Sequence, residues 1–342
     1  MNNLPISPDN ALPIPAPLGL MELFIILTFI IHILFVNFTV SLVTGAVGLE
    51  IAGKIKKSAF LDKMAKSCSF HASIHKSIAV VMGVAPLLII SVIYTQYFYS
   101  STILIGKIWI SVIPLLIIAF LLLYLYKFTW DKWQNKKALH ILVGFAAMLI
   151  LLYIPLIFIV NITSMLYPDK WGEVQGFFPS LLYYPQIWQR YLHFILASLA
   201  TGGFYVFLFY AYKSRKKGSL EDYEQSLKLF GAKVSLWITV VQLIAGFILL
   251  FAFKPEVRML FMGEDLLLTT LLMLSIVLTI ILCVFLFLAG YKDSFKSFVL
   301  SAAVFVLIVG IMGWIRHEVR ETYLSPYFDE FPRTEQSLEL EK

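Results

Sequence analysis

The stretch ILTFIIHILFVNF, residues 26–38, places His32 in the middle of bulky apolar side chains. Such a run is typical of a membrane-spanning helix, which needs roughly 20 mostly apolar residues. The rest of the chain is similar: 60% of its 342 residues are hydrophobic, only 14% are charged, and the mean hydropathy is +0.84. A soluble domain keeps roughly a quarter of its residues charged. The sequence therefore predicts a polytopic membrane protein.

About eight apolar runs are long enough to cross a bilayer, at residues 20–47, 71–98, 107–127, 138–163, 190–212, 228–253, 266–290 and 295–316. Only helices and closed barrels satisfy their backbone in lipid, and these runs are too long and too uniformly apolar for barrel strands. The predicted fold is an all-α transmembrane bundle over residues 19–316. Residues 1–18 are expected to form an exposed lead-in, without the basic region of a signal peptide, and residues 317–342 an acidic tail.

Lysines are concentrated in four alternate loops, those between spans 1 and 2, 3 and 4, 5 and 6, and 7 and 8. Basic residues in short loops mark the cytoplasmic side of a membrane protein. We therefore expect both termini on the extracytoplasmic side of an inner (cytoplasmic) membrane, with lipid around the bundle. The net charge of +6 follows from this topology, and no nucleic-acid partner is expected.

The six arginines follow a different pattern, because only Arg215 lies on the lysine-rich side. Four others fall at or near the outer ends of spans: Arg190, Arg258, Arg316 and Arg320. The guanidinium group binds carboxylates through two parallel hydrogen bonds. Two interpretations remain open. The arginines pair with acidic lipids or protein partners, or they hold the propionates of a cofactor near the outer surface.

All six histidines lie within a span or at its end: His32, His71, His75, His140, His193 and His317. Ionisable groups inside a membrane are costly and usually functional. A structural role remains an alternative for any one of them, but five within the first five spans favour a metal or haem site. Because the chain has no CxxCH motif and only two distant cysteines, no haem is attached covalently, and any haem is expected to be b-type.

Small residues follow three of these histidines at helical spacing. Ala79 and Gly83 follow His75, Gly144 and Ala147 follow His140, and Ala197 and Ala200 follow His193. A histidine above small residues leaves room for a flat macrocycle between helices, although small faces are also ordinary packing surfaces in membranes. Depth along the spans predicts one inner haem on His140 with His75 or His71, and one or two outer haems around His193 and His32.

Three segments resemble subunit I of the cytochrome bd quinol oxidases: LTFIIHILFVNFTVSL, RYLHFILASLATGGFYV and GWIRHEVRETY. The resemblance implies that His32 is an axial haem ligand, that His193 binds the low-spin haem, and that Glu318 is the family's glutamate ligand. His317, adjacent to Glu318, is an alternative to it. The second ligand of the low-spin haem is then expected at Met259 or Met262, beside Arg258.

Two features depart from that family. The third span contains no acidic residue, and the long quinol-binding loop between spans 6 and 7 is reduced to FKPEVRMLFMGED. The predicted function is therefore a haem-b electron-transfer subunit, an oxidoreductase of the quinol dehydrogenase type. It would work in a complex, between the quinone pool and an extracytoplasmic cytochrome c or iron–sulfur protein. The alternatives are a quinol-oxidising terminal oxidase of bd type, and a transporter or anchoring subunit without haem.

Overall fold

Eight long helices dominate the computed structural model, which describes residues 14–292 and 294–329. Each is long and apolar enough to cross a membrane, as the sequence predicted. They are α1 (Leu18–Lys56), α2 (Ala59–Ile93), α3 (Thr95–Phe128), α4 (Lys137–Met165), α6 (Ile187–Lys217), α7 (Asp222–Phe251), α9 (Leu266–Lys292) and α10 (Phe295–Leu324). Shorter elements are α5 (Phe177–Tyr183), α8 (Pro255–Met259), the π-helical turn η4 (Leu260–Glu264), and the 3₁₀ turns η2 (Gln134–Lys136), η3 (Pro168–Lys170) and η5 (Ser325–Tyr327).

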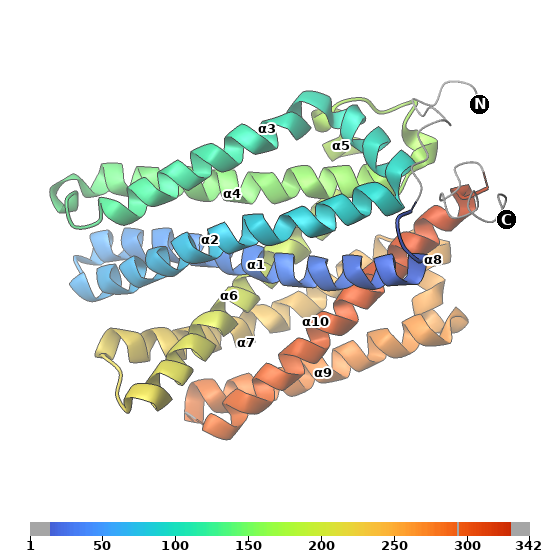
Figure 1. Ribbon diagram of the computed structural model, residues 1–342. Coiled ribbons are helices and arrows are strands. Elements are labelled where there is room, and N and C mark those ends of the chain that lie inside the picture. Colours follow the sequence, from blue (N-terminus) through green and yellow to red (C-terminus); the bar gives the residue numbers. More distant parts are fainter. Residues whose placement is uncertain (1–13, 293, 330–342) are drawn as a thin grey trace.

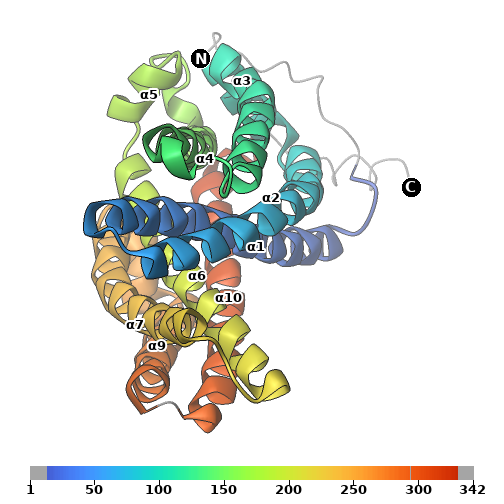
Figure 2. The same ribbon diagram turned by 90° about the vertical axis from the view of Figure 1, so that its left-hand side faces the viewer.

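The helices pack as four consecutive hairpins, α1–α2, α3–α4, α6–α7 and α9–α10. Helix α1 is central, because it contacts α2, α4, α6 and α10. Figure 2 shows the α3–α4 pair on one side of α1 and α2, and the remaining long helices on the other. The start of α1 and the end of α10 lie at the same end of the bundle (Figure 1), here called the outer end. The four hairpin turns lie at the opposite end, here called the lysine-rich end.

The helices extend further than the predicted spans. The segment 48–70, expected to be a loop, is almost entirely helical, because α1 ends at Lys56 and α2 begins at Ala59. The turn is closed by Lys57, whose φ of 50° is left-handed, and by Ser58, whose hydroxyl accepts a hydrogen bond from the Leu61 amide. With 39 residues, α1 is about 58 Å long at 1.5 Å per residue, well beyond the hydrocarbon core.

At the other end of the chain, α10 continues to Leu324, so the first part of the predicted tail is helical. The remainder of that tail, residues 330–342, and the lead-in residues 1–13 lie outside the described residues.

Helix α3 is broken near its outer end. Gly106 has φ 39° and ψ −105°, far from helical values and in a region that favours glycine. The break frees the carbonyl of Leu104 from its own helix, and the backbone amide of Gly176 donates to that carbonyl at 3.0 Å. The loop before α5 thus satisfies a polar group that would otherwise face lipid.

Glycines allow close helix crossings at the centre of the bundle. A Cβ added at Gly202 of α6 would lie 2.1 Å from the Ser41 side chain of α1. A Cβ at Gly203 would lie 2.8 Å from the carbonyl oxygen of Gly231 on α7. This is the small-residue packing that membrane helices use in place of a hydrophobic driving force. It sets α6, with its histidine, tightly between α1 and α7.

Candidate functional site

His32 lies on α1 and faces α2. Its Nδ1 is 2.9 Å from the carbonyl oxygen of Ala79. Because a carbonyl oxygen can only accept, Nδ1 carries the proton and Nε2 carries a lone pair. This tautomer is the one that leaves Nε2 able to bind a metal, with the second nitrogen held by a backbone carbonyl.

His193 lies on α6, and its ring faces α7. The side-chain amide nitrogen of Gln242 lies 3.0 Å from His193 Nε2 and 3.1 Å from the His193 carbonyl oxygen. Within the described part of the chain, the buried Nδ1 of His193 and Oε1 of Gln242 have no hydrogen-bond partner. Gly246 lies next to the ring, since a Cβ there would sit 3.9 Å from His193 Cε1. This imidazole is buried with its hydrogen-bonding capacity only partly used.

Three arginines gather at the outer end without a carboxylate partner among the described residues. Arg190 donates from Nε and Nη2 to the side-chain oxygen of Gln186, at 3.2 and 2.8 Å. Arg316 stacks over the ring of Phe29 with its Cζ 3.5 Å from the ring centroid. Arg320 is only 5% exposed, and its buried Nη1 has no partner. The three groups are close enough for Arg316 to interact electrostatically with both others.

A tyrosine network holds the elements around these arginines together. Gln186 donates from Nε2 to the hydroxyls of Tyr167 and Tyr323, both at 2.7 Å. The Tyr323 hydroxyl also accepts from the backbone amide of Lys254 at 2.9 Å. Burial raises the pKa of Tyr167, so its hydroxyl remains neutral. The network joins the α4–α6 loop, the α7–α8 turn and the end of α10.

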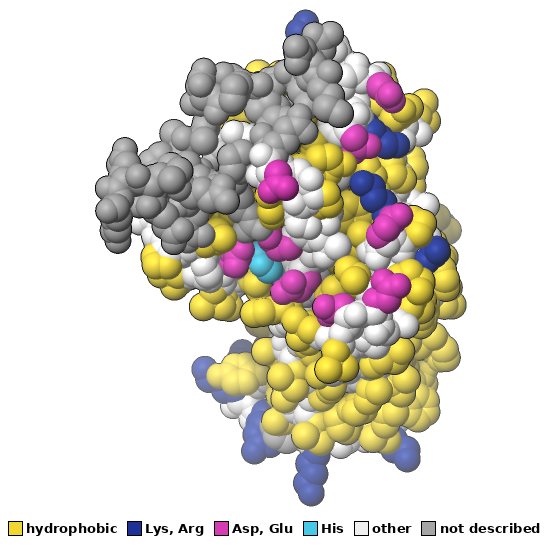
Figure 3. All heavy atoms as spheres, turned by 90° about the vertical axis from the view of Figure 1, so that its right-hand side faces the viewer, with side chains coloured by type: hydrophobic (Ala, Val, Ile, Leu, Met, Phe, Trp, Pro, Cys, Tyr) yellow, Lys and Arg dark blue, Asp and Glu magenta, His cyan; other side chains and the backbone are white. Residues whose placement is uncertain are grey.

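His317 lies close to two carboxylates at the outer end of the bundle. Ligand atoms of Glu22, His317 and Glu321 all lie within 4.8 Å of one another, and the Tyr94 hydroxyl donates to Glu321. Among the described residues, this is the one group of at least three such side chains compact enough to hold a metal ion. His32 and Glu318 do not belong to this group. Figure 3 shows acidic side chains gathered around a histidine on this end of the molecule.

The two methionines expected to complete the low-spin site lie at the surface. Met259 ends α8, Met262 lies in η4, and their side chains are 42% and 49% exposed. Neither element makes an extensive contact with α6. Arg258, between them and α7, stacks over Phe251 at 5.9 Å from the ring centroid. The structure does not bring these three residues to His193.

His71 and His75 share one face of α2, as their spacing predicted, and both meet Tyr205 of α6. The Tyr205 hydroxyl lies 2.9 Å from His71 Nδ1. His75 packs against Tyr205 with ring centroids 4.5 Å apart, and also against Phe35 and Phe38 of α1. Neither ring nitrogen of His75 has a hydrogen-bond partner among the described residues, although both are buried.

His140 differs from the expectation that it binds iron together with His75. Its Nδ1 lies 2.6 Å from Glu50 Oε1, and its Nε2 lies 2.8 Å from the carbonyl oxygen of Tyr126. Both ring nitrogens are therefore occupied. The α1 residues next to the two histidines, Phe38 and Glu50, are twelve positions apart, or about 18 Å along the helix. His75 is therefore not a partner of His140, and His71, the alternative, lies 2.9 Å from the Tyr205 hydroxyl instead.

The small residues below the histidines also serve packing rather than a macrocycle. The space above Gly83 is filled by the His32 ring, since a Cβ there would lie 2.7 Å from His32 Cε1. The space above Gly144 is filled by the Tyr126 ring, 2.6 Å from such a Cβ. The alternative of close helix packing holds at both glycines.

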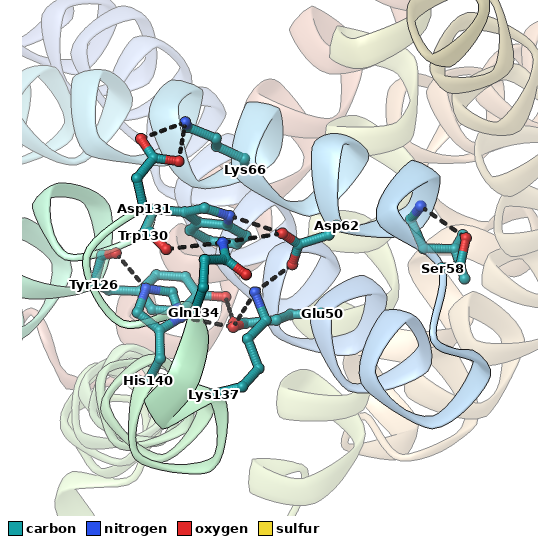
Figure 4. Close-up of polar contacts among 11 residues, drawn as sticks. Glu50, Ser58, Asp62, Lys66, Tyr126, Trp130, Asp131, Gln134, Lys137 and His140 are labelled. Atoms are coloured by element: carbon teal, nitrogen blue, oxygen red, sulfur yellow. Dashed lines mark hydrogen bonds and ion pairs between the residues drawn. The ribbon is translucent and has the colours of Figure 1, made fainter.

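Glu50 is the main residue that sequence reasoning missed. It is fully buried at the lysine-rich end, where it accepts from the Tyr126 hydroxyl at 2.6 Å and pairs with Lys137 at 3.1 Å (Figure 4). Lys137 also pairs with Asp62, which accepts from the Trp130 ring nitrogen at 3.2 Å. The available signal was an acidic residue that continues the first apolar run, close to its lysine-rich end. Glu22, Tyr205 and Gln242 were also missed, and nothing in their local sequence marks them.

These features define a polytopic α-helical membrane protein with histidines and arginines buried among its helices. The family model of cytochrome bd terminal oxidase subunit I matches residues 22–252. The chain belongs to this family, and it is therefore a membrane respiratory-chain subunit of the oxidase type.

Among solved structures, it is similar to the bd oxidase from Geobacillus thermodenitrificans. The TM-score is 0.68 with 15% identity, covering 92% of this chain and 89% of the other. That likeness supports the fold alone. No curated protein matches the sequence.

Proposed function

We propose that this chain is a haem-b-containing subunit that passes electrons between the quinone pool and a redox partner on the outer side of the membrane. Family membership supports a respiratory role. The more specific proposal depends on polar groups in the outer half of the bundle that the protein itself leaves without partners. Such groups are expensive to bury and point to a ligand that completes them.

The state of His32 is the observation that supports the proposal most strongly. Its Nδ1 is held by the Ala79 carbonyl, so the ring is oriented and Nε2 is left as a base. Haem iron takes an axial ligand of this kind, and a fixed second nitrogen sets the tautomer and ring direction. A purely structural histidine in lipid would be expected to have both nitrogens bonded, as His140 does.

The arginines fit the acidic edge of the same cofactor. Arg190, Arg316 and Arg320 supply positive charge with no carboxylate partner among the described residues. Haem propionates are carboxylates that such guanidinium groups bind through paired hydrogen bonds. When bound, haem would supply reversible one-electron chemistry, while these side chains orient it and neutralise its charge.

His193 is proposed as the ligand of a second haem. Its Nδ1 lacks a hydrogen-bond partner. The side-chain amide of Gln242 would move away from Nε2, so that iron could bind at that nitrogen. The other axial ligand is not assembled, since Met259 and Met262 lie at the surface. We propose that either methionine reaches this position when the α8–η4 segment rearranges around bound haem. Glu318 remains a proposed ligand on α10, where His317 instead faces Glu22 and Glu321.

The proposed partner is a cytochrome c or an iron–sulfur protein on the outer side. Acidic side chains on the outer end (Figure 3) would attract a partner with a basic surface and raise its rate of encounter. Quinone is the proposed second substrate, and the complex is expected to contain further subunits.

A bd-type terminal oxidase is the second candidate, and family membership favours it. The composition of α3 opposes it, because Thr95–Phe128 contains no aspartate or glutamate. The cytochrome bd family carries acidic residues on this helix for proton delivery, so oxygen reduction would need another proton donor.

The test is a reduced-minus-oxidised visible spectrum of the purified chain, with haem quantified as the pyridine haemochrome. We expect b-type bands at two or more haems per chain. Folded protein without haem would contradict the proposal and favour a transporter or anchoring subunit. Oxygen consumption with a quinol as donor separates the two candidates, since only the terminal oxidase consumes oxygen.

A further inference from the structure

The most completely built polar cluster of the bundle lies at the lysine-rich end, away from the proposed haem ligands. Figure 4 shows the carboxylate of Glu50 from α1 in contact with both Tyr126 of α3 and His140 of α4. The side chain of Glu50 is 0% exposed and that of His140 is 1% exposed. Trp130 packs edge-on against the imidazole with ring centroids 4.7 Å apart, which excludes water from that side.

Hydrogen-bond polarity fixes the number of protons in this cluster. The carbonyl oxygen of Tyr126, 2.8 Å from His140 Nε2, can only accept, so Nε2 carries a proton. The contact between His140 Nδ1 and Glu50 Oε1, at 2.6 Å, also needs a proton, because two lone pairs would repel each other there. That second proton belongs either to an imidazolium or to a carboxylic acid. In both cases the pair holds one proton more than a neutral imidazole with a carboxylate.

Charge balance leads to the same result. The charged groups that face the pair are Asp62 from α2 and Lys137 from α4, while α3 presents the neutral Tyr126. Two carboxylates and one ammonium leave one negative charge uncompensated. One shared proton makes the cluster neutral, and a neutral cluster is far cheaper to bury than a charged one. The nearby Lys66–Asp131 pair balances itself and lies in solvent.

We infer that Glu50 and His140 form a buried proton-binding site that exchanges its proton with water at the lysine-rich end. The proton would exchange with water by way of Lys137 and Asp62. Their side chains are 15% and 21% exposed, so they connect the buried pair to solvent. Lys137 contacts both carboxylates, so a small movement of its ammonium group connects the buried acid to the exposed one.

The site consists of protein side chains alone and needs no haem. Its use in turnover rests on the proposed function, because a membrane interior that receives electrons must also receive positive charge. A proton held between two bases next to α1 would meet that need in a family member whose third helix lacks acids.

The test uses the full-length chain in lipid nanodiscs near neutral pH, so it does not depend on enzyme activity. Protein with ¹⁵N-labelled histidine shows an imidazolium by NMR, and infrared spectroscopy shows a protonated carboxyl. We expect one of these two signals in the wild type, lost in both Glu50→Gln and His140→Gln. The Asp131→Asn variant is the matched control and should keep the signal. Either variant alone assigns the proton if the other does not fold.

Transfer to D₂O tests the exchange. The signal should shift on transfer, and more slowly in Asp62→Asn than in the wild type. Two results would overturn the inference. One is a wild type with neither signal at these residues, and the other is a signal that never exchanges. A haem-free protein that shows the exchanging proton would refute the proposed function while supporting this site.

Discussion

Two groups of buried polar side chains differ in how far the protein itself completes their hydrogen bonds: one around Glu50 and His140 at the lysine-rich end, and one around His193 and Arg320 in the outer half. At the lysine-rich end, His140 has both ring nitrogens bonded, and Glu50 is contacted by three side chains. In the outer half, by contrast, His193 Nδ1 and Arg320 Nη1 have no partner within the described chain. A set of polar groups that is complete without a ligand serves the protein itself. A set left incomplete in lipid implies a molecule that completes it.

Haem content should separate the two ends most strongly. His32→Ala and His193→Ala should each remove one haem per chain, because each deletes a proposed axial ligand. His140→Gln should leave the haem content unchanged, because its imidazole is already bonded to Glu50 and Tyr126. Pyridine haemochrome assays on matched amounts of folded protein measure this. Loss of haem in His140→Gln, with none in His32→Ala, would reverse the comparison.

Stability should show the second largest difference. Glu50→Ala leaves His140 Nδ1 buried without its partner and removes one of the two carboxylates that Lys137 contacts, and we expect a loss of about 3–5 kcal/mol. Asp131→Asn removes the partner of an exposed pair and should cost about 0–1 kcal/mol. Denaturant unfolding in detergent provides both values. An equal loss of unfolding free energy in the two variants would mean that the buried cluster stabilises the protein no more than the exposed Lys66–Asp131 pair does.

Arg320 offers a test in the opposite direction. Its uncompensated buried guanidinium should destabilise the haem-free protein, so Arg320→Leu should stabilise that form by about 1–3 kcal/mol. The same change should weaken haem retention, because one positive charge toward the propionates is lost. Thermal unfolding with and without haem measures both effects. A haem-free variant less stable than wild type would show that the arginine already has an adequate partner.

An effect on stability no larger than that of Arg320→Leu is expected at Gly83. A Cβ there would lie 2.7 Å from the His32 ring, so Gly83→Ala should displace the imidazole and cost about 1–3 kcal/mol. Gly45→Ala is the control on α1, where nothing lies within 4 Å of the new Cβ. The expected signature is an altered haem spectrum in Gly83→Ala alone. Unchanged spectra in both variants would remove His32 from the haem site.

The spans, their number and their helical type could be predicted from the sequence, because lipid imposes a length and a hydropathy on each of them. Their limits could not. Residues 48–56 continue α1 because nothing before Lys57 breaks the helix. The apolar pattern indicates only the part of a helix that lies in lipid, not the residue at which the helix ends. The break at Gly106 was equally invisible, since a glycine in an apolar run has several possible roles.

The site was predictable in composition but not in pairing. The histidines on α1, α2, α4 and α6 were found because ionisable residues are rare in spans. The partner of each histidine depends on how its helix is rotated and how deep it lies in the bundle. Residue spacing within one helix does not predict either quantity. Glu50 and His140 are ninety positions apart, and only the packing of α1 against α4 brings them together. The two interpretations of the glycines could not be separated for the same reason, since the group that fills their space comes from another helix.

The broken α3 has a consequence for membrane insertion. The Leu104 carbonyl receives its hydrogen bond from Gly176, which is synthesised only after α4 has been made. Until that loop reaches the outer side, α3 would enter the bilayer with an unsatisfied carbonyl, which is costly in lipid. Helices α3 and α4 and their outer loop should therefore insert as one unit. A chain truncated before Gly176 should leave α3 poorly inserted even though its hydropathy is among the highest in the protein.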